Sequence, residues 1–247
     1  MGGQLVLPRH GESTANAAGT FTGLLNALLT DRGEHQARAA GRLLRAHGIV
    51  PNWIITSTLH RARRTAELVS EVLGREAPTD AWWELNERNY GALTGATKTT
   101  ARAQLGDAAY MRLRRSVDGR PAPMPLHTWW TLRTSPTLRH APTAAIRRTE
   151  TLRDVIDRTG PVLVARVLPA VRAGATVLVV AHGNSLRAVC THIDHLSDAE
   201  VADLNLPTGQ PLRYRITPTG ALAPRGGEYL DPEALDAAAL VAAEGGT

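Results

Sequence analysis

Three segments of the chain combine histidine or arginine with small polar residues, and each follows a short apolar run. They are Arg9-His10-Gly11-Glu12-Ser13, Thr56-Ser57-Thr58-Leu59-His60-Arg61 and Ala181-His182-Gly183-Asn184-Ser185. Guanidinium and imidazole groups bind phosphate oxygens, as do the free backbone N–H groups that open helices. The combination predicts a site for an anionic phosphoryl group.

A sheet is the structure that would bring these segments together. Short apolar runs at 5–7, 53–55 and 176–180 alternate with helical periodicity at 34–47, 61–73 and 186–193. This order is typical of βαβ units, and ligands of an open α/β sheet bind outside the carboxyl ends of its strands. A capping box at Ser197–Glu200 opens a last short helix, and a final strand covers 212–216. We therefore expect a three-layer α/β/α fold with a mostly parallel central sheet.

Two segments give weaker signals. The stretch from Pro121 to Pro142 carries five prolines around a Trp-Trp pair, so we expect a divergent, irregular, lid-like insertion at about 121–148. From Glu233 onward the chain is rich in alanine, which is typical of either a short surface helix or a flexible, frayed tail from about residue 231. We expect the whole chain, 1–247, to form one domain.

The charge of the chain suits a small anionic ligand. Its 247 residues include 28 Lys and Arg, of which only Lys98 is lysine, against 23 Asp and Glu, for a formal charge of +5. The arginines are spread along the chain, whereas nucleic acid favours a dense basic stripe, and the single phenylalanine, Phe21, argues against base stacking. We expect a small phosphorylated acid as partner and no nucleic acid.

Neither a membrane nor a metal is expected. No apolar run approaches membrane-spanning length, and the first residues lack the charged and apolar regions of a signal peptide, so we expect a cytoplasmic protein. His10 and His182 could suggest a metal, but they lack carboxylates or histidines at ligand spacing. The sequence leaves a homo-oligomer open.

Five motifs follow one another along the chain. They are Arg9-His10-Gly11-Glu12-Ser13, Asn16, Phe21-Thr22-Gly23, Leu85-Asn86-Glu87-Arg88 and Ala181-His182-Gly183-Asn184-Ser185-Leu186-Arg187. With its surroundings, about residues 4–123 and 149–230, this set resembles the histidine phosphatase superfamily and, within it, the cofactor-dependent phosphoglycerate mutases. The resemblance implies interconversion of 3-phosphoglycerate and 2-phosphoglycerate through a phosphohistidine. It also implies priming by 2,3-bisphosphoglycerate as phosphoryl donor, with no metal.

The resemblance and the chemistry of the side chains together assign five catalytic residues. His10 is the expected nucleophile, because an imidazole nitrogen can take a phosphoryl group and release it. Arg9 and Arg61 would grip the phosphoryl oxygens, and His182 would donate to them from the side opposite His10. Glu87 is the expected general acid and base. The alternatives are structural: a strand-end cap, surface ion pairs, a core histidine and a solvated loop glutamate, respectively.

A second group of residues is expected to bind the rest of the substrate. By resemblance they are Ser13, Asn16, Thr22, Gly23, Arg88, Tyr90, Lys98, Arg114 and Arg115, with Gly183 and Asn184 beside the phosphoryl group. The doublet of Arg114 and Arg115 could otherwise be a solvated helix face. Lys98 falls where the family places its lysine, and a second anionic subsite favours a mutase over a phosphatase.

Departures from the family keep other functions open. Pro8 is expected to end strand pairing early, because proline lacks a backbone N–H, and Ala15 and Leu24 stand where tryptophan is usual. The segment 124–148, which lies over the active site in the family, matches poorly. A changed lid would let water reach a phosphohistidine. The alternatives are a histidine-type phosphatase for a small phosphorylated metabolite and a catalytically silent phospholigand-binding protein.

Overall fold

Six strands form one sheet in the computed structural model, which describes residues 2–139 and 141–243. They are β1 (Gln4–Pro8), β2 (Trp53–Ser57), β3 (Thr79–Trp82), β4 (Thr176–Val180), β5 (Pro211–Ile216) and β6 (Leu222–Tyr229). Across the sheet their order is β3-β2-β4-β1-β5-β6, with β1 to β4 parallel and the last two antiparallel to their neighbours. The expected mostly parallel sheet is confirmed. The strands β3 and β6 lie outside the predicted set, because neither contains a continuous apolar run.

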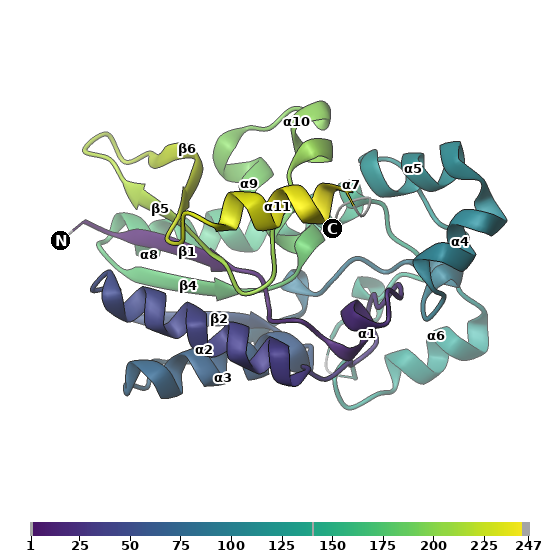
Figure 1. Ribbon diagram of the computed structural model, residues 1–247, viewed down its shortest axis with the longest axis horizontal. Coiled ribbons are helices and arrows are strands. Elements are labelled where there is room, and N and C mark those ends of the chain that lie inside the picture. The colour runs from purple at the N-terminus through teal and green to yellow at the C-terminus, as the bar shows by residue number, and fades with distance from the viewer. Residues whose placement is uncertain (1, 140, 244–247) are drawn as a thin grey trace.

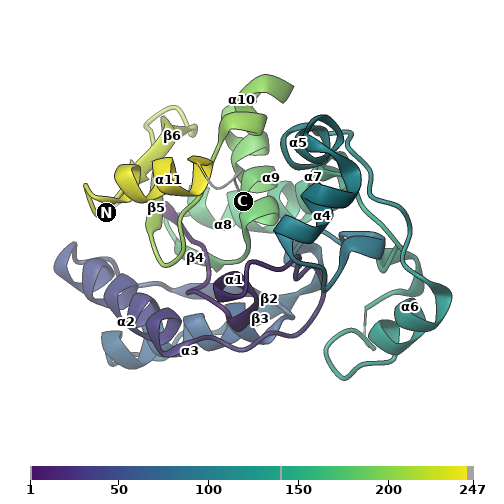
Figure 2. The same cartoon turned by 45° about the vertical axis from the view of Figure 1, so that its right-hand side comes forward.

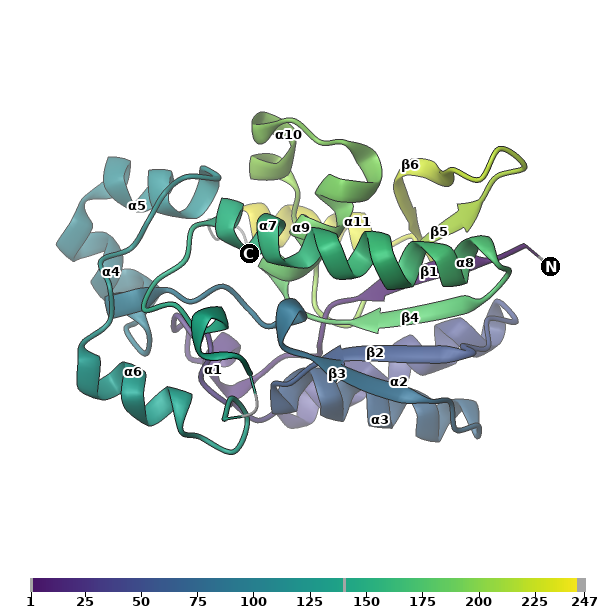
Figure 3. The ribbon, with the colours of Figure 1, turned by 180° about the vertical axis from the view of Figure 1, so that it is seen from behind.

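Helices cover both faces of the sheet (Figure 1, Figure 3). They are α2 (Asp31–Ala46) and α3 (His60–Leu73) on one face, and α7 (Leu152–Val162), α8 (Leu168–Arg172) and α9 (Gly183–Asp194) on the other. Successive side chains of a strand point to opposite faces. Accordingly Val6 packs with Leu44 of α2, whereas Leu5 and Leu7 belong to the cluster that contains Val189 of α9. The predicted three layers are therefore confirmed.

Four further helices gather around the carboxyl ends of the parallel strands (Figure 1, Figure 2). They are α1 (Thr14–Ala17), α4 (Lys98–Leu105), α5 (Asp107–Arg115) and α6 (Leu126–Arg133), while α10 (Asp198–Asp203) and α11 (Ala234–Ala243) belong to the side of the antiparallel strands. The predicted capping box opens α10: the Ser197 hydroxyl accepts from the backbone N of Glu200, whose carboxylate accepts from the Ser197 backbone. The alanine-rich tail forms a helix over residues 234–243.

The prediction of an irregular 121–148 segment is wrong in part, because α6 lies within it. Pro125 is the residue before the first turn of α6, where a missing backbone N–H costs no helical hydrogen bond. Trp129 donates from its ring nitrogen to the carbonyl oxygen of Ile146 at 2.7 Å. Leu132 is buried with Met124 in a separate apolar cluster, which gives this segment a small core of its own.

Pro8 does not end strand pairing. Its carbonyl oxygen accepts from the backbone N of Ala181 at 3.4 Å, and the carbonyl oxygen of Ala181 accepts from the backbone N of His10 at 3.0 Å. The proline therefore removes one donor but keeps its acceptor, and the ladder between β1 and β4 continues to the first catalytic candidate.

Candidate active site

A cavity of about 590 Å³ lies at the carboxyl ends of the strands. The predicted site residues that line it are Arg9, His10, Asn16, Thr22, Gly23, Arg61, Glu87, Tyr90, Lys98 and Arg114. Four more predicted residues, Ser13, His182, Gly183 and Asn184, are buried in the wall behind this lining. The three polar segments that the sequence singled out therefore do converge.

The hydrogen bond between His10 and Gly11 leaves the other ring nitrogen of His10 without a proton, as a nucleophile requires. The residue is 2 % exposed, and its Nδ1 lies 2.6 Å from the carbonyl oxygen of Gly11. Because a carbonyl oxygen only accepts, this contact assigns the ring proton to Nδ1 and a lone pair to Nε2. Burial, and then the cations of Arg61 and Arg9, hold the pKa of His10 well below its usual range. The imidazole is therefore neutral at physiological pH.

Arg61 lies against that lone pair. The residue is in the first turn of α3 and is 1 % exposed. Its Nε donates to Nε2 of His10 at 3.3 Å, and its terminal nitrogens donate to the carbonyl oxygens of Leu25 at 2.8 Å and Gly23 at 3.0 Å. Burial lowers the pKa of Arg61 to about 10, so the side chain stays charged at neutral pH. A fixed positive charge thus faces the nucleophile.

Strand pairing brings His182 beside His10. Arg9 and Ala181 form a bridge just past the ends of β1 and β4, so the two histidines that follow them lie with ring centres 4.9 Å apart. Nε2 of His182 is 2.6 Å from the Ser57 hydroxyl oxygen. Burial, and then the neighbouring cations, hold the pKa of His182 well below its usual range. Within the described residues, Nδ1 of His182 and Nε of Arg9 are buried without a hydrogen-bond partner.

The carboxylate of Glu87 is held at the cavity by an amide. Asn184 donates from Nδ2 to Oε1 of Glu87 and to the Tyr90 hydroxyl, at 2.9 Å each. The same carboxylate oxygen accepts from the backbone N of Arg88 at 2.6 Å. Arg187 in turn donates from Nη1 to Oδ1 of Asn184 at 3.2 Å, which fixes the amide orientation. A candidate acid and base therefore lies at the cavity in a defined position.

Two cations of the predicted second subsite also line the cavity. Lys98 is the first residue of α4. Arg114 lies in the last turn of α5 and is 4 % exposed, with its guanidinium carbon 5.5 Å from the centre of the Phe21 ring. Both side chains add positive charge to the cavity beyond that beside His10, so it can take a ligand with more than one anionic group.

Two predicted substrate-binding residues, Arg88 and Arg115, do not line the cavity. Arg88 is buried, and its guanidinium donates to the carbonyl oxygens of Glu150 and Leu113 at 2.8 and 3.1 Å, so these donors bind the main chain. The Arg115 side chain points away from the cavity, and it donates to the carbonyl oxygen of Ala202 at 3.0 Å. An adjacent pair on a helix points to different sides, and only Arg114 of this pair faces the cavity.

Sequence reasoning missed residues that act from behind the lining. Ser57 contacts His182, and Arg187 contacts Asn184. Ser57 belongs to one of the polar segments named above and Arg187 to the last of the five motifs. Their sequence positions do not show whether they face the ligand or the side chains that bind it. In the part of the chain that the structure describes, no group of three or more His, Cys, Asp or Glu side chains could hold a metal ion. No helix within that part is both long and apolar enough to cross a membrane.

Family comparison agrees with this geometry. The sequence profile described as "Histidine phosphatase superfamily (branch 1)" matches residues 5–141 and 126–222. The chain belongs to the histidine phosphatase superfamily. Two similar members of known sequence are both named 2,3-bisphosphoglycerate-dependent phosphoglycerate mutase. The protein from Corynebacterium diphtheriae is 44 % identical over 245 residues, which are 98 % of either chain. The protein from Thermobifida fusca is 46 % identical over 231 residues, which are 93 % of this chain and 94 % of its own.

Solved structures of the superfamily share the fold. The alpha-ribazole phosphatase from Shigella flexneri has a TM-score of 0.65 at 22 % identity, over 94 % of this chain and 97 % of its own. A mycobacterial glucosyl-3-phosphoglycerate phosphatase has a TM-score of 0.64 at 24 % identity, over 86 % of this chain and 92 % of its own. At these identities the likeness shows the fold of this superfamily member and leaves its substrate to other evidence.

Proposed function

We propose that this superfamily member is a phosphoglycerate mutase that interconverts 3-phosphoglycerate and 2-phosphoglycerate. Relatives with that name match nearly the whole chain at 41 to 46 % identity. One observation carries the proposal at the level of atoms: Nε2 of the neutral, buried His10 bears a lone pair and lies against the guanidinium of Arg61. A nitrogen nucleophile beside a fixed cation suits the transfer of an anionic phosphoryl group.

The transfer step uses the residues at the cavity. Nε2 of His10 attacks phosphorus with its lone pair, the nitrogen–phosphorus bond forms, and the bond from phosphorus to the leaving oxygen breaks. Glu87 gives a proton to that oxygen, and it later takes one from the hydroxyl group that attacks the phosphohistidine. Arg9, Arg61 and His182 stabilise the charge on the phosphoryl oxygens. In the primed protein, phosphorylated His10 first gives its phosphoryl group to the free hydroxyl group of the substrate, which forms 2,3-bisphosphoglycerate. Attack of His10 on the other phosphoryl group of that molecule then releases the isomer and restores the phosphohistidine.

The donor atoms present fit a doubly anionic priming donor. The unpartnered Nε of Arg9 and Nδ1 of His182 can both donate to one phosphoryl group. The Ser57 hydroxyl supports this protonation, because it can donate to Nε2 of His182 and leave the ring proton on Nδ1. Lys98 and Arg114 would hold the second anionic group. The donor 2,3-bisphosphoglycerate would supply the phosphoryl group that His10 carries.

We further propose that the chain, residues 1–247, acts as one domain in the cytoplasm and needs no metal. The continuous sheet through both antiparallel and parallel strands supports one domain. Arginine side chains supply positive charge, and neutral His182 adds an N–H donor, in place of the Mg²⁺ that nucleotide-dependent transfer uses.

A coupled mutase assay tests the proposed function. The assay is run with and without 2,3-bisphosphoglycerate, and phosphate release is measured in parallel. We expect isomerisation that depends on the primer, little phosphate release, and an acid-labile, base-stable phosphoryl group on the protein. Phosphate release without isomerisation would instead support a phosphatase. Ligand binding without a phosphorylated protein would support a silent binding protein.

A further inference from the structure

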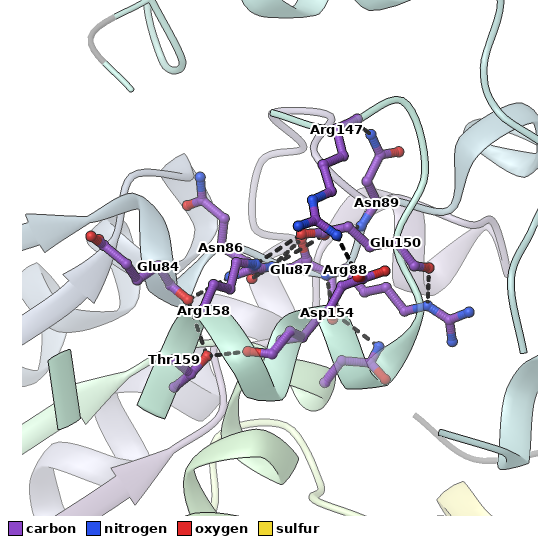
Figure 4. Close-up of polar contacts among 12 residues, drawn as sticks. Glu84, Asn86, Glu87, Arg88, Asn89, Arg147, Glu150, Asp154, Arg158 and Thr159 are labelled. Atoms are coloured by element: carbon purple, nitrogen blue, oxygen red, sulfur yellow. Dashed lines mark hydrogen bonds and ion pairs between the residues drawn. The ribbon is translucent and has the colours of Figure 1, made fainter. Parts of the chain in front are cut away.

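One buried ion pair touches the loop that carries Glu87 (Figure 4). Arg158 of α7 and Glu150, which precedes that helix, lie 2.9 Å apart between Nε and Oε1, and their side chains are 9 % and 4 % exposed. Burying two charges removes their hydration, so a buried ion pair is weak evidence for a contribution to stability. The contacts that the pair makes with the loop show a different use.

Arg158 binds the main chain on the N-terminal side of the Glu87 carboxylate. Its guanidinium donates to the carbonyl oxygens of Glu84, Asn86 and Glu87, with distances of 2.8 Å to Asn86 and 3.3 Å to Glu87. Thr159 adds a second donor to the carbonyl oxygen of Glu84 at 3.2 Å. Residues 86–90 belong to no helix or strand, so these side-chain donors stand in for regular backbone pairing.

Glu150 binds the main chain on the other side of Glu87. Its Oε2 accepts from the backbone N of Asn89 at 2.8 Å, and its carbonyl oxygen accepts from Nε of Arg88 at 2.8 Å. The same Oε2 also lies 3.3 Å from Nη2 of Arg158. The ion pair therefore clamps the loop before and after Glu87, and each charged group satisfies polar atoms that burial would otherwise leave without partners.

We propose that Arg158 and Glu150 are positioning residues that set the Glu87 carboxylate for proton transfer. The inference rests on the proposed function, in which Glu87 is the general acid and base. Neither Arg158 nor Glu150 belongs to the lining of the cavity, so a role for the pair in the reaction would run through Glu87. A displacement of about 1 Å at a reacting group can cost about 10²-fold in rate.

A double-mutant cycle between Arg158 and Glu87 tests the proposal. Arg158→Lys keeps the charge but cannot reach all three carbonyl oxygens, because an ammonium lacks the planar fork of a guanidinium. We expect it to lower kcat by about 10²-fold with KM changed less than about threefold, since only positioning is lost. In the Glu87→Gln background the same substitution should change the rate by less than about threefold. Single-turnover transfer from phosphorylated His10 to 3-phosphoglycerate makes the slow variants measurable.

Matched variants separate positioning from folding. Arg153→Lys lies on the same helix, where Arg153 forms exposed ion pairs with Asp118 and Asp198, and it should leave kcat unchanged. Glu150→Gln removes the charge of the ion-pair partner and keeps the shape of its side chain. If Arg158→Lys does not fold, Glu150→Gln takes its place in the double-mutant cycle. It should then lower kcat in the wild-type background and change the rate little in the Glu87→Gln background. Thermal unfolding of each variant reports how much protein is folded in the assay.

Each contrary result has a distinct meaning. An unchanged kcat for both Arg158→Lys and Glu150→Gln would overturn the positioning role, and so would equal losses in the wild-type and Glu87→Gln backgrounds. Full activity of Glu87→Gln would overturn the role of Glu87 and, with it, that of the clamp. A wild-type protein with neither isomerisation nor phosphorylated His10 would contradict the proposed function itself.

Discussion

Nε2 of His10 and Nε of Arg61 lie 3.3 Å apart, so the atom that would bond phosphorus already has a guanidinium beside it. Burial, and then this cation, lower the pKa of His10 and keep the nucleophile unprotonated. At this distance the guanidinium is also close enough to donate to the oxygens of a phosphoryl group bound to Nε2. One side chain thus prepares the nucleophile and receives the charge that the transfer develops.

Arg61→Lys should lower kcat/KM by about 10²- to 10³-fold, which is the usual cost of losing one donor to a developing charge. A lysine ammonium cannot hold the Gly23 and Leu25 carbonyl oxygens and still contact His10. Kinetics of the mutase reaction measure the loss, and Arg63→Lys, at an exposed position of the same helix, is the matched control. Equal activity of the two variants would contradict the role of Arg61.

His10→Ala should abolish isomerisation and any phosphate release together, by about 10⁴-fold or more, because both pass through the same nucleophile. Mass spectrometry of the protein after incubation with 2,3-bisphosphoglycerate should show the phosphoryl group on wild type and none on the variant. His35→Ala, at an exposed position of α2, should retain both activity and phosphorylation. Activity in the His10 variant would exclude the phosphohistidine route.

The sequence predicted the site well for the residues whose positions are set by strand pairing. His10 and His182 follow apolar runs, and parallel pairing of those runs places the two rings side by side. Roles that depend on the direction of a side chain were harder to predict. Arg114 and Arg115 are adjacent in the sequence, yet they point to different sides of α5. The contacts of Arg158 could not be predicted from the sequence either, because the carbonyl oxygens that it binds in residues 84–87 lie 71 to 74 positions away along the chain.

The helix α6 could not be predicted from composition alone. Proline density predicts irregular structure, but it does not show that Pro125 stands just before a helix, where proline is tolerated. Composition also does not show which segments line the cavity. Within the described residues, the lining includes none from 121–148, whereas α11 contributes Ala237, Leu240 and Val241.

Acid should destabilise the fold through its two buried histidines. Both His10 and His182 have a pKa well below the ordinary 6.5, so the unfolded chain binds protons below pH 6.5 that the folded chain does not. The free energy of unfolding should therefore fall as pH drops below 6.5, by up to about 1.4 kcal/mol per pH unit for each histidine. It should be insensitive to these two groups above that pH. The acid limb of kcat/KM should likewise lie below pH 6.5.

Denaturant unfolding between pH 5.5 and 7.5 measures this effect. His10→Gln should be less sensitive to acid than wild type, because one titrating group is gone, while carboxylates that titrate in both proteins cancel in the difference. His35→Gln, at an exposed site, should follow the wild-type curve. Parallel curves for wild type and His10→Gln would contradict a lowered pKa at His10.

Removal of α11 should shift the reaction from transfer toward hydrolysis. Because this helix supplies part of the lining, deleting residues 234–247 should open the cavity to water and raise phosphate release relative to isomerisation by about tenfold. Two leucines of the helix give a matched pair: Leu240 and Leu235 are 69 % and 67 % exposed, but of the two only Leu240 lines the cavity. Leu240→Ser should raise the ratio and Leu235→Ser should not. Equal ratios for the two serine variants, together with an unchanged ratio in the truncated protein, would show that α11 does not exclude water from the phosphohistidine.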